Sequence, residues 1–158
     1  MNHVPAASDS PQVIAPPPFV YAVGLATGIV INFAKPVPFV PEHLAVAAGI
    51  ALMLIAVFLM ALALRALVRA GTNVDVRKPS LVIATTGPYR FTRNPIYLAM
   101  ALFMVGAGVF FNALWVLVAL VPVMFVIRFG VIAREETYLT QKFGEEYLRY
   151  KARVRRWL

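Results

Sequence analysis

Two short polar clusters hold most of the residues that could do chemistry in this sequence. Residues 86–97 combine two arginines with two tyrosines at the start of an apolar run. Asn94 is a favoured N-cap and Pro95 suits a first helical position, so a helix is predicted to begin there. A helix N-terminus presents free N–H groups and a partial positive charge. With Arg90 and Arg93 beside it, this segment could receive a carboxylate, and its tyrosines could stack on a flat ring.

The second cluster, Arg134-Glu135-Glu136, lies further along the chain, just beyond an apolar run. The sequence has seven acidic residues, and two of them adjoin here. Either carboxylate could bind a cation or the hydroxyl groups of a ligand held by the first cluster. A structural alternative stays open for both clusters, in which the arginines reach lipid phosphates and the glutamates pair with neighbouring arginines.

Two further features also have a functional and a structural interpretation. Arg128 is the one charge within the last apolar run, which makes it a functional candidate unless it extends to the interface. Residues 147–157 interleave basic and aromatic side chains. Nucleic-acid-binding segments have similar composition, but directly after a membrane hairpin an interfacial helix on anionic lipid is favoured. We therefore expect membrane lipids, and no nucleic acid, as partners.

Four apolar segments are predicted to position these clusters. Residues 44–64 carry no polar side chain and form the clearest membrane span, since about 20 apolar residues cross the hydrocarbon core. The apolar run 96–127 is too long for one span, because a single helix of that length would extend about 48 Å against a core of about 30 Å. It is expected to fold as a hairpin that turns at Asn112. The predicted spans are residues 19–34, 44–64, 95–111 and 113–133.

The segments outside these spans differ in composition. Residues 1–18 are rich in Pro, Ala and Ser and are predicted to form a flexible tail, with residues 19–158 as one membrane domain. Beyond the last span the chain is amphipathic, and Gly144 is expected to separate two short helices. We predict an all-α integral membrane protein with about four transmembrane helices, a hairpin of the third and fourth helices, and a C-terminal amphipathic cytoplasmic helical segment.

Composition supports the membrane class and excludes several kinds of site. Apolar residues make up 61% of the sequence, charged residues 14%, and the mean hydropathy is +0.77. These values are those of a chain more apolar than an ordinary soluble domain. The absence of cysteine excludes disulfides, thiolate metal sites and cysteine nucleophiles, and with two histidines we expect no metal site.

The basic residues predict how the protein is oriented. Lys and Arg total 15 against 7 acidic residues, and they gather in residues 65–94 and after the last span. The other two connections carry only Lys35 between them. Because basic segments stay preferentially in the cytoplasm, we expect both termini and the active face to be cytoplasmic, in a bacterial inner membrane.

In order and spacing, the two clusters resemble a known family. The chain is similar, over residues 86–154, to the integral membrane methyltransferases that include isoprenylcysteine carboxyl methyltransferase and the phospholipid N-methyltransferases. The match consists, in chain order, of Gly87-Pro88-Tyr89, Arg93-Asn94-Pro95-Ile96-Tyr97, a helical hairpin, Glu135-Glu136 and Phe143-Gly144-Glu145-Glu146-Tyr147. The resemblance implies transfer of a methyl group from S-adenosylmethionine to a lipophilic small molecule or lipid.

The resemblance also implies a cofactor site made from both clusters. The residues expected to bind S-adenosylmethionine are Gly87, Pro88, Tyr89, Arg90, Arg93, Asn94, Pro95, Tyr97, Glu135 and Glu136. Glu136 and Arg128 are expected to act in catalysis, and either Arg128 or Arg134 takes the place of an arginine that precedes the glutamates in the family. Asn94 stands where the family usually has histidine, and asparagine cannot carry a proton near neutral pH. The alternative function is a non-catalytic membrane scaffold or lipid-binding subunit that retains the family fold.

Overall fold

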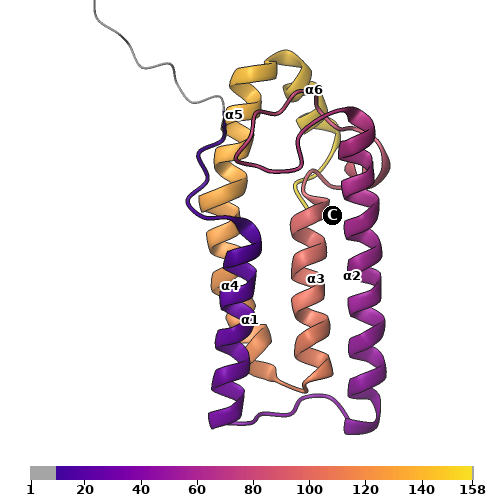
Figure 1. The fold of residues 1–158 in the computed structure, drawn as a ribbon, viewed down its shortest axis with the longest axis vertical. Coiled ribbons are helices and arrows are strands. Elements are labelled where there is room, and N and C mark those ends of the chain that lie inside the picture. The colour runs from indigo at the N-terminus through magenta and orange to yellow at the C-terminus, as the bar shows by residue number, and fades with distance from the viewer. Residues whose placement is uncertain (1–9, 158) are drawn as a thin grey trace, which may run out of the picture.

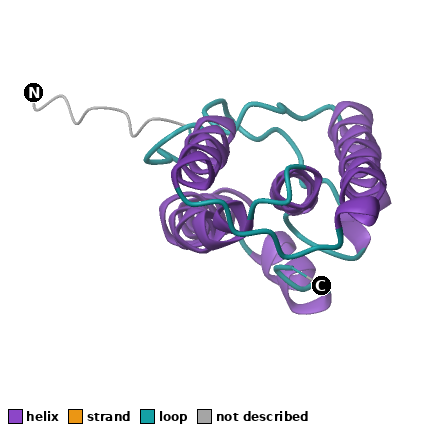
Figure 2. Ribbon diagram, turned by 90° about the horizontal axis from the view of Figure 1, so that it is seen from below, coloured by secondary structure: helices purple, strands orange, loops and turns teal. Residues whose placement is uncertain are grey.

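The computed structural model describes residues 10–157, and every helix or strand assigned in this part of the chain is a helix. The elements are α1 (Pro17–Ala34), α2 (Glu42–Ala70), the 3-10 helix η1 (Gly87–Arg90), α3 (Pro95–Phe110), α4 (Leu114–Val126), the π-helical turn η2 (Ile127–Ile132), α5 (Ala133–Phe143) and α6 (Glu145–Arg153). Helix α3 stands between α2 on one side and α1 with α4 on the other (Figure 1, Figure 2). The prediction of an all-α protein is confirmed.

Three helices are long and apolar enough to cross a membrane. They are α1, α2 and the continuous helix Leu114–Phe143, which α4, η2 and α5 form together. Helix α3 is also apolar, but its 16 residues are fewer than a span usually has. In the most apolar stretch of α2 only 17% of the residues are buried, so most of its side chains face outward, as lipid-facing side chains do. These helices support an integral membrane protein, and a fourth span stays a prediction.

Helix α4, the second arm of the hairpin, continues into an irregular turn, η2, that the apolar pattern of this segment does not indicate. Pro122 lies inside α4, and η2 follows it with the wider spacing of a π-helix. The N–H of Ile14 donates to the carbonyl of Gly130 in η2 at 3.3 Å. A Cβ at Gly130 would overlap the Ile14 side chain, so glycine permits this approach. Residues 1–9 of the predicted flexible tail lie outside the described residues.

The predicted turn at Asn112 is present and holds two connections together. Asn112 has a φ of 48°, in the left-handed region that asparagine tolerates. Its side-chain oxygen accepts hydrogen bonds from the N–H groups of Phe39 and Val40, both at 2.9 Å, and its Nδ2 donates to the carbonyl of Val40 at 2.8 Å. The turn of the α3–α4 hairpin is therefore fixed to the connection between α1 and α2.

Close packing of α2 against α3 sets the position of the helix that carries the first polar cluster. A Cβ at Gly49 would lie 2.5 Å from the backbone of Phe110, and one at Gly106 would lie 2.8 Å from the side chain of Met53. Small residues allow membrane helices to approach this closely. Helix α3 is therefore held firmly by α2, with its N-terminal end at the charged end of the bundle.

Candidate functional site

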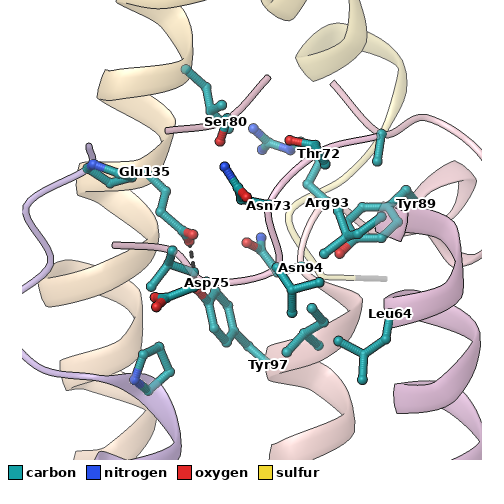
Figure 3. A pocket seen from close by; sticks show the side chains of 18 of the residues that line it. Leu64, Thr72, Asn73, Asp75, Ser80, Tyr89, Arg93, Asn94, Tyr97 and Glu135 are labelled. Atoms are coloured by element: carbon teal, nitrogen blue, oxygen red, sulfur yellow. Dashed lines mark hydrogen bonds between the residues drawn. The ribbon is translucent and has the colours of Figure 1, made fainter. Parts of the chain in front are cut away.

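A cavity of about 580 Å³ lies at the charged end of the bundle, within the size range of small-molecule sites (Figure 3). Helices α2, α3, α5 and α6, the end of η1 and the loop after α2 all contribute to its walls. The predicted site residues that line it are Tyr89, Arg93, Asn94, Tyr97, Glu135 and Glu136. The fold therefore brings the two polar clusters together around one space.

Other predicted residues lie outside the cavity wall. Gly87 and Pro88 form the start of η1, which places Tyr89. Pro95 is buried as the first residue of α3, and Arg90 is exposed. These residues shape the segment without facing the cavity, and their expected roles in cofactor binding stay predictions.

Arg128 and Arg134, the arginines shortly before or beside the glutamates in the sequence, do not line the cavity. Arg128 is exposed, and its guanidinium lies 5.3 Å from the centre of the Phe129 ring. Arg134 is also exposed and donates to the carbonyl of Gln12 at 2.7 Å. The catalytic role predicted for Arg128 has no contact with the cavity to support it.

Glu135 faces the cavity and interacts with a tyrosine. The hydroxyl of Tyr97 donates a hydrogen bond to Glu135 Oε2 at 2.9 Å, and the carbonyl of Tyr97 accepts one from the hydroxyl of Tyr21, also at 2.9 Å. Within residues 10–157, no lysine or arginine forms an ion pair with Glu135. Its carboxylate is therefore available to a donor or a cation inside the cavity.

Glu136 has the opposite environment, because three cations surround its carboxylate. Arg156 donates from Nε to Oε1 at 2.9 Å and from Nη2 to Oε2 at 2.7 Å. Arg93 Nη1 lies 3.0 Å from Oε1, and Lys151 Nζ lies 3.5 Å from Oε2. The hydrogen bonds that Arg156 donates to Glu136 raise the pKa of its guanidinium. Protein groups already occupy both oxygens of Glu136, whose side chain is 8% exposed.

Arg93 is a buried cation with unused donors. Its side chain is 9% exposed, and its Nε and Nη1 have no hydrogen-bond partner in the described part of the chain. Nη1 lies close to Glu136 but forms an ion pair with it and no hydrogen bond. Unsatisfied donors of a buried charged group are costly in an empty site and are satisfied by an acceptor. An anionic group in the cavity would supply that acceptor.

Four buried tyrosines add aromatic surface to the cavity: Tyr89, Tyr97, Tyr147 and Tyr150. The hydroxyl of Tyr150 donates to the carbonyl of Tyr89 at 2.8 Å, which joins α6 to η1. Burial raises the pKa of Tyr147 to about 12, so its hydroxyl stays protonated at neutral pH. Their rings can pack on a flat ring or lie beside a cation.

The loop between α2 and η1 contributes a third carboxylate. Asp75 lines the cavity and accepts hydrogen bonds from Arg77 Nε at 3.0 Å and Nη2 at 2.8 Å. The side-chain hydrogen bond with Arg77 is the main cause that lowers the pKa of Asp75 to about 2. Figure 3 shows Asp75 and Glu135 on one side of the cavity, with Tyr89 on the other. Asp75 and Glu135 therefore lie on the same side of the cavity.

The comparison with known families covers both clusters. A family model described as phospholipid methyltransferase matches residues 44–146, well over half of the chain. The chain belongs to the phospholipid methyltransferase family. The matched segment runs from α2 through the hairpin to the start of α6, so it includes every predicted site residue. The resemblance inferred from the two clusters is confirmed.

Other comparisons extend less far. An uncharacterized protein of Haemophilus influenzae is 78% identical over 27 residues, which are 17% of this chain and 43% of that protein. The match therefore spans less than half the length of this curated relative. No solved structure matches the chain.

In this member of the phospholipid methyltransferase family, Asn94 does not act as predicted. It occupies the N-cap position of α3, but its side chain makes no capping hydrogen bond. Its Nδ2 donates to the carbonyl of Arg156 at 2.9 Å, because the C-terminal residues lie across the start of α3. The predicted side-chain cap is therefore wrong, although the helix does begin at Pro95.

Several site residues were missed from the sequence. Asp75, Tyr147 and Tyr150 line the cavity, and Lys151 and Arg156 reach Glu136. The spacing of Tyr147 and Tyr150 places them on one face of a helix, which was a usable signal. No pattern indicates Arg156, whose contact depends on how the chain turns back after α6.

Proposed function

We propose that this protein transfers a methyl group from S-adenosylmethionine to a lipophilic acceptor at the cytoplasmic face of the membrane. The observation that carries the proposal is a cavity that joins charged and aromatic side chains to an apolar groove between the helices. Membership of a methyltransferase family supports the reaction type. The basic residues gathered at the same end of the bundle support a cytoplasmic orientation.

The cavity residues fit the functional groups of the cofactor. Arg93, whose buried Nε and Nη1 have no hydrogen-bond partner among residues 10–157, suits the carboxylate of the cofactor's amino-acid part. Glu135, with which no lysine or arginine of residues 10–157 forms an ion pair, suits the ammonium group or the ribose hydroxyls. The tyrosines suit the adenine ring. When bound, S-adenosylmethionine supplies an electrophilic methyl group on its sulfonium sulfur.

A second cavity of about 320 Å³ suits the acceptor. It is a groove between α1, α2 and α3, lined by Pro18, Tyr21, Ala22, Leu25, Ala56, Val57, Met60, Met100, Phe103 and Met104. Pro18, Met60 and Met100 also line the main cavity, so the two spaces adjoin. An alkyl chain could occupy the groove while the polar end of the same molecule enters the main cavity. Helices α1 and α2 both border the groove, so the acceptor would enter from the lipid around them.

The protein's contribution to such a reaction is alignment and proton transfer. Methyl transfer is an in-line displacement, so holding the acceptor atom opposite the sulfur accounts for much of the rate enhancement. An acceptor that loses a proton also needs a base. We assign that role to Glu135, since no lysine or arginine of the described residues pairs with its carboxylate and Tyr97 donates a hydrogen bond to it.

Calorimetry with S-adenosylhomocysteine, the demethylated product, tests the cofactor assignment on detergent-solubilised protein. The wild type should bind the nucleoside, and Arg93→Gln should weaken binding at least about tenfold, because it removes a charged hydrogen-bond donor. Arg149→Gln is a matched control and should bind like the wild type, since Arg149 is exposed and does not line the cavity. Absence of binding to folded wild-type protein would favour the non-catalytic scaffold.

A further inference from the structure

The last residues of the described chain cross the start of α3 and are held there by backbone contacts. We call residues 154–157 the C-terminal strap. The N–H of Arg93 donates to the carbonyl of Arg155 at 2.9 Å. The carbonyl of Arg156 accepts from the hydroxyl of Thr92 at 3.0 Å and from Nδ2 of Asn94 at 2.9 Å. Thr92 and Asn94 are both buried, so the strap is anchored on the interior of the first cluster.

These anchors do not depend on the side chain of Arg156. They use backbone atoms of the strap, and Trp157 adds apolar contact with the core of the bundle. The side chain of Arg156 is therefore free to turn toward Glu136. It binds that carboxylate with two hydrogen bonds, which is the geometry that orients a carboxylate most firmly.

The charges around Glu136 do not cancel. One carboxylate faces the guanidinium groups of Arg93 and Arg156, with the ammonium group of Lys151 at 3.5 Å. Arg156 donates to both oxygens, whereas Arg93 approaches Glu136 with Nη1 alone, and its Nε and Nη1 have no hydrogen-bond partner among residues 10–157. The cluster thus carries a net positive charge and presents buried donors beside the cavity.

We propose that Arg156 is a positioning residue, which engages Glu136 and so leaves Arg93 available to an anionic group of the ligand. This inference rests on the proposed function, because the ligand's anionic group is taken to be the carboxylate of the cofactor. Without Arg156, Arg93 is the nearest cation left for Glu136. Arg93 then turns to pair with both oxygens and is lost to the ligand. Asn94 supports the arrangement by holding the strap in place.

A double-mutant cycle separates positioning from a merely structural role. The affinity for S-adenosylhomocysteine is measured by calorimetry for wild type, Arg156→Gln, Glu136→Gln and the double variant. Arg156→Gln should bind about tenfold more weakly, the size of one lost charge-assisted hydrogen bond. In the double variant, Arg93 has no carboxylate to pair with, so binding should recover to within about threefold of the wild type. If Arg156 has only a structural role, the losses of affinity in Arg156→Gln and Glu136→Gln should instead add in the double variant.

Two further variants guard against loss of folding. Arg155→Gln removes the same charge from the neighbouring exposed residue and should bind like the wild type. Arg156→Lys keeps the charge without the two-pronged contact and should bind with intermediate affinity.

The outcomes distinguish the two proposals. Wild-type protein that binds no S-adenosylhomocysteine overturns the proposed function and the inference with it. Wild-type binding with an unchanged Arg156→Gln variant, or with additive losses in the double variant, overturns the inference alone.

Discussion

The hydroxyl of Tyr97 donates a 2.9 Å hydrogen bond to Glu135, which lies 38 residues further along the chain. This bond links the first turn of α3 to the first turn of α5. The carbonyl of Tyr97 also accepts a hydrogen bond from Tyr21 of α1. Three helices therefore meet at one tyrosine. The glutamate that accepts its hydrogen bond forms no ion pair with a lysine or arginine of residues 10–157.

Tyr97→Phe is expected to weaken binding of S-adenosylhomocysteine several-fold, because it removes the hydrogen bond that orients Glu135. Tyr21→Phe is the matched control, since it removes the neighbouring hydrogen bond outside the main cavity. It should lower the melting temperature and leave the affinity unchanged. Equal losses of affinity in the two variants, measured by calorimetry, would show that Glu135 is not oriented through Tyr97.

Arg128→Gln is expected to leave cofactor affinity within about twofold of the wild type, as surface substitutions away from a site usually do. Arg128 is exposed and contacts Phe129, although its sequence position suggested a catalytic role. Arg93→Gln, measured in the same calorimetric series, is the positive control. A loss of affinity in Arg128→Gln as large as that in Arg93→Gln would show that Arg128 contributes to cofactor binding.

Met60→Trp is expected to reduce methyl transfer by a larger factor than it reduces the affinity for S-adenosylhomocysteine. Met60 lines both the groove and the main cavity, so a larger side chain there obstructs the path of the acceptor. Phe58→Trp is the control, because Phe58 is 65% exposed on the same helix and lines neither space. Transfer of radiolabel from S-adenosylmethionine to a bacterial lipid extract measures the difference. Unchanged transfer in Met60→Trp would mean that the acceptor does not use the groove.

Gly49→Ala is expected to reduce the free energy of unfolding by about 1–3 kcal/mol, the usual cost of overpacking a close contact. Its added methyl group would lie 2.5 Å from the backbone of Phe110, so α2 and α3 must separate. Ala51→Leu, on an exposed face of the same helix, should change stability by less than about 0.5 kcal/mol. Thermal unfolding in detergent compares them, and equal melting temperatures would contradict the close packing of α2 on α3.

The loop between α2 and η1 is expected to lose its Asp75–Arg77 pair only in strong acid. The pKa of Asp75 is lowered to about 2, chiefly by its hydrogen bond with Arg77. In the unfolded chain, an aspartate has a pKa of about 4. The pair therefore stabilises the folded state fully above about pH 4, and this stabilisation is lost as the pH falls through the lower pKa of the folded state. Carboxyl chemical shifts of Asp75 should therefore titrate near pH 2 in the wild type and near pH 4 in Arg77→Gln. Titration near pH 4 in both proteins would show that the pair does not form.

The sequence was sufficient to predict the elements that depend on local patterns. The apolar runs indicated the helices, and Asn112 and Gly144 indicated where the chain turns. Gly144 has a φ of 52°, a conformation that glycine adopts without strain. The order of the two polar clusters was also sufficient to indicate the family. The apolar runs, Asn112 and Gly144 are local signals, because each lies within or directly beside the element that it indicates.

The side-chain partners within the site could not be predicted, because they depend on contacts between segments that are far apart in the sequence. Asn94 was expected to cap α3, but its side chain makes no capping hydrogen bond, and its Nδ2 donates to the carbonyl of Arg156, 62 residues away. Glu136 was expected to act in catalysis and to bind the cofactor, and it does line the cavity, but Arg156, 20 residues on, donates to both of its oxygens. Residue type and spacing cannot rank two such neighbouring glutamates. Only the path of the chain after α6 decides which carboxylate stays available.

The π-helical turn η2 has a consequence for how relatives of this chain can vary in length. Each hydrogen bond of a π-helix spans one residue more than that of an α-helix, so the turn Ile127–Ile132 accommodates an extra residue within the helix. A relative could lose one residue here, straighten into an α-helix, and still present its glutamates to the same space. A deletion within α4 or α5 would instead turn every later side chain by about 100°. The number of residues between the hairpin and the glutamates can therefore differ by one among homologues that share the same site.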